Sequence, residues 1–122
     1  MNTALWIVQG ILAAMFLMSG SMKTFKSIDE LAPKMPWVKQ VPSWQVRFIG
    51  ITQLLAAFGL ILPKLTGILP VLTPVAALGL VLTMVSAAIF HLKRNEMQAI
   101  GINMALLSLA LFVAVGRLFL IP

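Results

Sequence analysis

Cysteine is absent from this chain, and side chains able to ligate a metal are few. Without cysteine the protein forms no disulfide and performs no thiol redox chemistry, and cysteine usage gives no indication of its compartment. One histidine and three acidic residues are too few for a typical metal site, which takes three or four ligands from histidine, cysteine and carboxylates. We therefore expect no metal centre built from this chain alone, and no membrane disulfide oxidoreductase.

Charge is also scarce. Charged residues make up 10% of the 122 residues and hydrophobic residues 61%, with a mean hydropathy of +1.04. Four stretches contain no charged residue: 1–22, 48–63, 65–92 and 97–116. A helix needs about 20 apolar residues to cross roughly 30 Å of hydrocarbon. The sequence therefore predicts a single-domain integral membrane protein, and the lack of an acid within these stretches argues against a proton-coupled transporter.

The apolar stretches predict an all-α transmembrane four-helix bundle with helices at about 3–25, 43–62, 73–93 and 96–119. No basic residue precedes the first stretch, so we interpret it as a retained span and not as a signal peptide. The connection 26–42 holds three prolines, which allow only a short interfacial segment. Ser27 and Glu30 have the spacing of a capping box, so a short helix is expected to begin there.

Basic residues are distributed unequally between the two ends of this bundle. Four spans place both termini on one side, where only Lys64 and Arg117 lie. The other side holds Lys23, Lys26, Lys34, Lys39, Arg47, Lys93 and Arg94. By the positive-inside rule the loops 23–47 and 93–96 are cytoplasmic and both termini are outside. The net charge of +6 is then explained by topology and anionic lipid headgroups, not by nucleic acid.

Small residues recur on one face of each expected helix, and such faces allow close packing in membranes. The four faces are Gly10, Ala13, Ala14, Leu17, Gly20 and Ser21; Arg47, Gly50, Gln53 and Ala57; Gly79, Thr83, Ala87 and His91; and Gly101, Ala105, Ser108 and Gly116. We expect these faces to meet in the interior of the bundle.

A polar side chain at membrane depth is costly, so each one is a candidate for function. Gln53 could contact a polar headgroup such as a quinone carbonyl, or form an interhelical hydrogen bond. Lys23, Arg47 and His91 are expected at the cytoplasmic helix ends, where they could form a basic pocket and where imidazole could relay protons. The alternative is that Lys23 and Arg47 are interface anchors and His91 is a capping or headgroup contact.

Other polar residues receive structural interpretations. Asn103 falls opposite Gly101 and Ala105, which indicates a second interface or a lipid-facing position. Arg117 is expected to anchor the terminal side at the membrane interface. Gln9 flanks the first small face and is expected to make a packing hydrogen bond.

Several segments, taken in order, resemble the DoxX-like family of small bacterial four-helix membrane proteins. They are 19–23 (SGSMK), 47–51 (RFIGI), 57–63 (AFGLILP), 73–80 (TPVAALGL) and 87–94 (AAIFHLKR). The family often has a glutamate at the position of Gln53, so chemistry that depends on that carboxylate is absent or different here. The resemblance implies a multi-pass protein of the bacterial inner membrane.

Two functions are compatible with the resemblance, because some relatives belong to membrane redox complexes and others act in membrane-protein assembly. The first is an accessory or anchor subunit of a quinone-linked complex, with Lys23, Arg47, Gln53 and His91 binding the quinone and a soluble partner on the cytoplasmic side carrying any flavin or metal. The second is a non-enzymatic protein that binds a lipid or small apolar ligand, or assists membrane-protein assembly. In neither reading is the chain catalytic alone, and a homo-oligomer is possible in both.

Overall fold

The computed structural model describes residues 1–121, and these residues form helices and connections without any β-strand. The elements are α1 (Asn2–Phe25), α2 (Ile28–Leu31), the 3₁₀ turn η1 (Pro36–Lys39), α3 (Ser43–Thr66), α4 (Leu72–Lys93), α5 (Met97–Val115) and η2 (Gly116–Leu120), a π-helical continuation of α5. α1, α3, α4 and α5 with its continuation are each long and apolar enough to cross a membrane. The prediction of an all-α four-helix membrane protein is confirmed.

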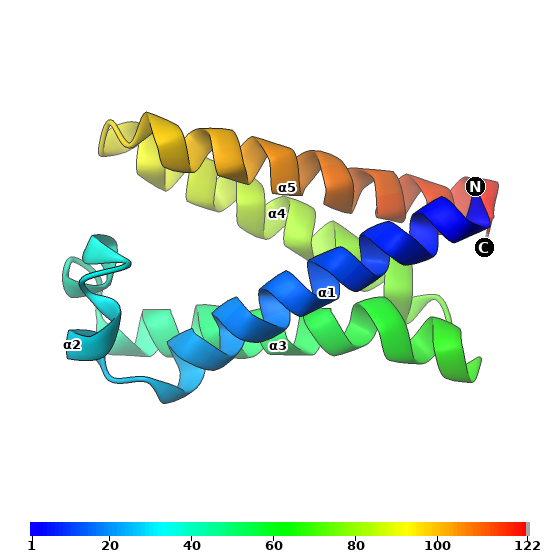
Figure 1. Ribbon diagram of the computed structural model, residues 1–122, viewed down its shortest axis with the longest axis horizontal. Helices are drawn as coiled ribbons and strands as arrows, with labels where there is room; N and C mark the ends of the chain where they lie inside the picture. Colours follow the sequence, from blue (N-terminus) through cyan, green and yellow to red (C-terminus); the bar gives the residue numbers. More distant parts are fainter. Residues whose placement is uncertain (122) are drawn as a thin grey trace.

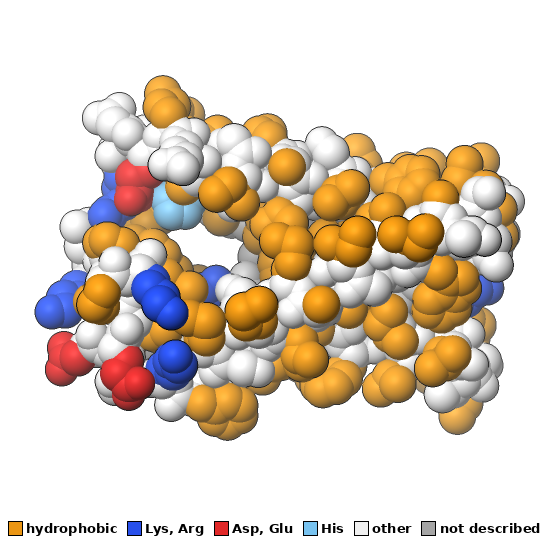
Figure 2. Space-filling view, in the orientation of Figure 1, with side chains coloured by type: hydrophobic (Ala, Val, Ile, Leu, Met, Phe, Trp, Pro, Cys, Tyr) orange, Lys and Arg blue, Asp and Glu red, His pale blue; other side chains and the backbone are white. Residues whose placement is uncertain are grey.

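The four long helices form two pairs, α1 with α3 and α4 with α5 (Figure 1). Both chain termini lie at one end of the bundle, where the pairs converge, and we call this the closed end. At the other end the pairs diverge, and the segment holding α2 and η1 lies between them. We call this the open end, and most of the lysine and arginine side chains visible in Figure 2 gather there.

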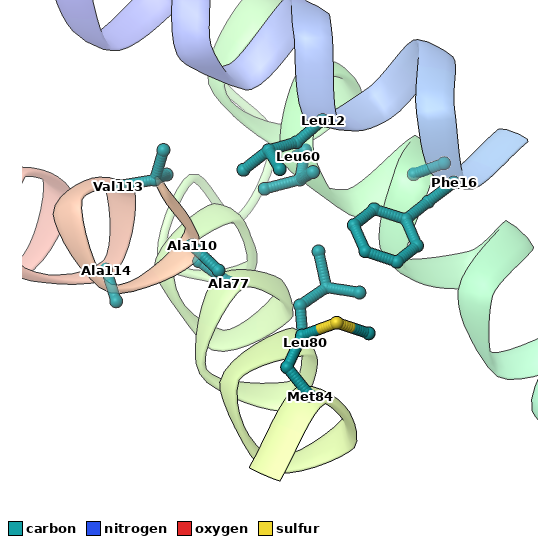
Figure 3. Packing of buried hydrophobic residues seen from close by; sticks show 10 residues of the cluster. Leu12, Phe16, Leu60, Ala77, Leu80, Met84, Ala110, Val113 and Ala114 are labelled. Atoms are coloured by element: carbon teal, nitrogen blue, oxygen red, sulfur yellow. The ribbon is translucent and has the colours of Figure 1, made fainter. Parts of the chain in front are cut away.

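A core of buried apolar side chains joins the two pairs (Figure 3). Leu12 and Phe16 come from α1 and Leu60 from α3. They face buried residues of α4 and α5, which are Ala77, Leu80, Met84, Ala110, Val113 and Ala114. The α5 contribution is small or β-branched, and this lets α5 approach the other helices closely, as is usual where lipid surrounds the bundle.

α3 does not end before Pro63, as the sequence predicted, but continues to Thr66. Proline has no N–H, so within a helix it leaves the carbonyl four residues earlier without its usual donor. That carbonyl belongs to Gly59, and the hydroxyl of Thr73 donates to it over 3.0 Å. The buried Thr73 thus substitutes for the missing donor, and α3 ends one turn later at Gly67, whose positive φ of 75° suits a helix C-cap.

The connection between α1 and α3 folds on a small apolar cluster of its own. Ser27 caps α2 as its spacing predicted, since its hydroxyl accepts from the Glu30 N–H over 3.2 Å. Leu31 of α2, Val38 of η1 and Val46 of α3 are buried together. This cluster holds the segment against the start of α3 at the open end.

The small-residue faces are only partly internal. On α5 the expected face is wrong, because Gly101, Ala105 and Ser108 are exposed and only Gly116 is buried. The interior face of α5 carries Asn103 instead. About two turns further along the helix it continues with the core residues Ala110, Val113 and Ala114. On this helix the cost of exposing a polar side chain to lipid outweighs the advantage of burying small ones.

Candidate functional site

Two glycines bring the backbones of α1 and α3 into contact near the open end. A Cβ atom added to Gly20 would lie 2.8 Å from the Gly50 carbonyl oxygen and 2.9 Å from the Leu54 nitrogen. A Cβ atom on Gly50 would lie 2.8 Å from Cβ of Lys23. The predicted small faces of α1 and α3 thus meet at these two glycines, although Gly10, Ala14 and Leu17 of the α1 face are exposed. The crossing fixes the residues one turn away from each glycine.

Lys23 and Gln53 are those residues, and they bond to each other. Side chains of a helix lean toward its N-terminus, which directs Lys23 back along α1 toward Gln53. Lys23 Nζ donates to Gln53 Oε1 over 3.1 Å and to Ser19 Oγ over 3.0 Å, and Ser19 Oγ donates to Gln53 Oε1 over 3.2 Å. Lys23 is 8% exposed and Gln53 4% exposed. The indole of Trp37 lies 5.8 Å from Nζ and adds a cation–π contact.

Arg47 is close to Lys23 in the structure but performs a different task. Its Nη1 donates to the Lys23 backbone carbonyl over 2.8 Å, and it also contacts the backbone carbonyl of Lys26. These carbonyls lie in the last turn of α1 and at its C-cap residue, where helix carbonyls have no intrahelical N–H donor. Arg47 therefore caps α1 and fixes its end, and it is not among the residues that line the cavity described below.

His91 belongs to a polar cluster at the turn between α4 and α5. Its Nδ1 lies 3.0 Å from Glu96 Oε1, and Arg94 Nε donates to the same oxygen over 2.6 Å. The hydrogen bonds from His91 and then from Arg94 lower the pKa of the Glu96 carboxyl below its ordinary value. Arg94 also bonds to Gln40 Oε1, and Phe90 meets the Trp37 ring edge-on at 6.0 Å. The turn is thereby tied to the α1–α3 connection across the open end.

A cavity of about 810 Å³ lies between the two helix pairs at the open end. Figure 2 shows the molecule hollowed there, beside the histidine. Its walls are mainly apolar residues of α3 and α4, and Lys23, Gln53 and His91 all line it. The expected small face of α4, with Gly79, Thr83 and Ala87, lines it too, so this face borders the cavity instead of packing on a helix. The structure thus brings three of the four candidate residues to one cavity.

Asn103 is a buried polar lining residue that the sequence interpretation missed. It was expected on an interface or lipid-facing side of its helix, but it is 8% exposed and borders the cavity. Its Nδ2 has no hydrogen-bond partner among the described residues. The spacing of polar residues could have predicted this position. Asn103 and Arg117 are 14 residues apart, close to four helical turns, so both lie on one face of α5 and its continuation η2.

Arg117 is not an exposed anchor, as the sequence predicted, but is 3% exposed at the closed end. It donates to Gln9 Oε1 and Asn2 Oδ1, each over 2.8 Å, and to the Ile121 carbonyl over 3.0 Å. Gln9 in turn donates to the Leu60 carbonyl over 2.6 Å, which confirms its predicted packing bond. This network connects α1, α3 and the end of α5 and borders no part of the cavity.

Comparison with known proteins identifies the family but no close relative. No curated protein and no solved structure is significantly similar to the chain. Within residues 1–121, no three histidine or carboxylate side chains gather into a group able to hold a metal ion. A sequence profile of the DoxX-like family matches residues 7–113, which include every residue of the cavity. The chain is a multi-pass membrane protein that belongs to the DoxX-like family.

Proposed function

We propose that this protein binds a quinone in the open-end cavity and serves as an accessory subunit of a quinone-linked redox complex. The observation that carries the proposal is the combination of an apolar cavity of about 810 Å³ with buried donors at Lys23 and Gln53. Sites for small molecules commonly have volumes of roughly 300–1,000 Å³, apolar walls and a few directed polar groups.

The polar end of the cavity suits a hydrogen-bond acceptor. An ammonium group has three donors, and Lys23 uses two of them on Ser19 and Gln53. Gln53 accepts through Oε1, which leaves its Nε2 amino group as a further donor. Among the described residues no acidic side chain lines the cavity, so a cationic headgroup would find no carboxylate partner there. A quinone carbonyl oxygen accepts hydrogen bonds and carries no positive charge, and it matches this set.

The apolar part of the cavity suits a hydrocarbon tail. Leu55 of α3 and Leu82 of α4 line it, and both are also exposed on the outside of the bundle. A tail lying between α3 and α4 would therefore continue directly into the bilayer. The same path admits the acyl chain of a lipid, and this is the observation that favours the alternative function of binding a lipid or another apolar ligand.

The proposed orientation places the open end in the cytoplasm. Seven of nine lysine and arginine residues belong to that end by sequence, in agreement with the positive-inside rule for a bacterial inner membrane. A soluble redox partner would then dock on the cytoplasmic side and carry the electron-transferring flavin or metal. Cytoplasmic activity of a reporter fused to the C-terminus would contradict this orientation.

The test is saturable quinone binding by the purified protein in nanodiscs. Lys23→Met is expected to weaken binding about tenfold, the loss of one charge-assisted hydrogen bond. Lys26→Met is the matched control, because Lys26 is exposed directly after the same helix and its side chain does not line the cavity. This variant should bind like the wild type. If the wild type binds phospholipid but no quinone, the alternative function is correct.

The redox role needs a separate measurement in cells. For one electron donor, membranes from a deletion strain should reduce quinone more slowly than wild-type membranes. Reintroducing the wild-type gene should restore the rate, and reintroducing the gene with Lys23→Met should not. Unchanged quinone reduction with all donors would contradict the role in a redox complex, even if the purified protein binds quinone.

A further inference from the structure

α1 and α5 each contribute a single residue to the lining of the cavity. These are Lys23 and Asn103, and each is polar and more than nine-tenths buried. α3 and α4 supply the walls, and most of their lining residues are apolar. A polar side chain therefore reaches the cavity from each of the two helix pairs, one from α1 and one from α5.

Asn103 differs from the hydroxyl-bearing residues around it. Thr52, Thr83 and Ser86 also line the cavity, but each hydroxyl donates to a backbone carbonyl of its own helix over 2.8–2.9 Å. The Nδ2 of Asn103 donates to nothing among residues 1–121. A buried donor without a partner is unfavourable, and in a membrane helix it is more so because no water is at hand. The side chain thus has unused hydrogen-bonding capacity at the edge of an apolar cavity.

We infer that Asn103 is a further headgroup-binding residue, and that its carboxamide donates to an oxygen atom of the ligand from α5 while Lys23 and Gln53 bind the headgroup from α1 and α3. This inference rests on the proposed function for the nature of the ligand. It requires an amphiphile with oxygen acceptors in its headgroup, a quinone or a phospholipid. The terminal torsion of asparagine is broad, so the carboxamide can turn its amino group toward the cavity when a ligand enters.

A ligand held in this way connects the two helix pairs where they diverge. It would bond to α1 and α3 through one end of its headgroup and to α5 through the other. Because it binds only the folded bundle, it should also raise the thermal stability of the protein, and the gain should grow with the logarithm of its concentration once that concentration exceeds Kd.

The test compares Asn103→Leu with Thr83→Val in detergent-purified protein. Thr83 is the matched control, since it lines the same cavity but its hydroxyl is already bonded within α4. The two probes are ubiquinone-1, followed by tryptophan fluorescence quenching, and phosphatidylglycerol, followed by native mass spectrometry. Asn103→Leu should weaken whichever probe the wild type binds by about five- to tenfold, while Thr83→Val changes it less than about twofold.

Folding of the variant is checked by measuring its melting temperature in the same preparation. Asn103→Leu removes an unpartnered buried donor and keeps the same number and branching of side-chain heavy atoms, so the ligand-free variant should melt at or above the wild-type temperature. Binding by Asn103→Leu within about twofold of wild type would overturn the inference, as would a wild type that binds neither probe. If only phosphatidylglycerol binds and Asn103→Leu weakens it, the quinone proposal fails and the role of Asn103 stands.

Discussion

The two ends of the bundle each bury one cationic side chain, and they use it differently. At the closed end Arg117 donates to two side chains and a backbone carbonyl and lies 5.4 Å from the Trp6 ring. At the open end Lys23 donates to two side-chain oxygens and borders the cavity. Burial of a cation therefore does not by itself identify a binding site. A position beside the cavity with a donor left over is a stronger indication, and of these two cations Lys23 alone lies beside the cavity.

The largest expected effect is the loss of stability when Arg117 is replaced. Arg117→Met should lower the free energy of unfolding by about 3 kcal/mol, because hydrogen bonds to charged groups are worth about 1.5–3 kcal/mol and the oxygens of Gln9 and Asn2 lose a donor. Lys23→Met should lower it by less than about 1 kcal/mol, since Ser19 can still donate to Gln53. Equilibrium unfolding in mixed micelles measures the free energy of unfolding of both variants. Equal losses in the two variants would contradict the difference described between the two ends.

Next in size is the effect of crowding the contact between α1 and α3. Gly20→Val should destabilise the protein by about 2 kcal/mol, because its Cβ would meet backbone atoms of α3 that have no room to give. Gly10→Val on the same helix is the control, since nothing lies within 4 Å of a Cβ there. Ligand binding should fall with Gly20→Val as well, because the crossing places Lys23. Retained stability would show that α1 and α3 are not in contact as described.

A smaller effect is expected from the contacts that close the open end. Trp37→Ala removes the edge-on contact with Phe90 and the cation–π contact with Lys23, and should cost about 1 kcal/mol. Quinone should then dissociate faster, as measured by stopped-flow fluorescence. Trp44→Ala is the control, because Trp44 is 65% exposed and does not line the cavity. An unchanged dissociation rate in Trp37→Ala would show that the connection does not cover the site.

The smallest expected effect is the dependence of stability on pH through Glu96. The pKa of this carboxyl is lowered from 4.5 in the folded protein, so ionised Glu96 stabilises the fold above that pH. The contribution should be lost as pH falls below 4.5 and through the lowered folded pKa. Melting temperatures between pH 7 and pH 3 should therefore drop less in Glu96→Gln than in the wild type. Parallel curves for the two proteins would contradict the contacts with His91 and Arg94.

The sequence predicted the membrane class, the four spans and the charge difference between the ends, because apolar length and basic residues act locally along the chain. It also placed Gln53 correctly on an internal face. It failed at Asn103 and Arg117, where a rule about small residues opposed a rule about polar ones on the same helix. The end of α3 was also misplaced, since the donor that allows Pro63 within the helix comes from Thr73 of another helix. Such contacts between distant residues cannot be read from local patterns.

The bond between Thr73 and Gly59 has a mechanical consequence. It joins α3 to α4 near the end where the helix pairs converge, so a relative tilt of the pairs about this bond would move the open end most. A helix of 20 residues is a lever arm of about 30 Å. A tilt of about five degrees about this bond would therefore shift the far tips by about 2.6 Å. Lateral pressure in the bilayer, acting on these arms, would thus set the width of the cavity mouth.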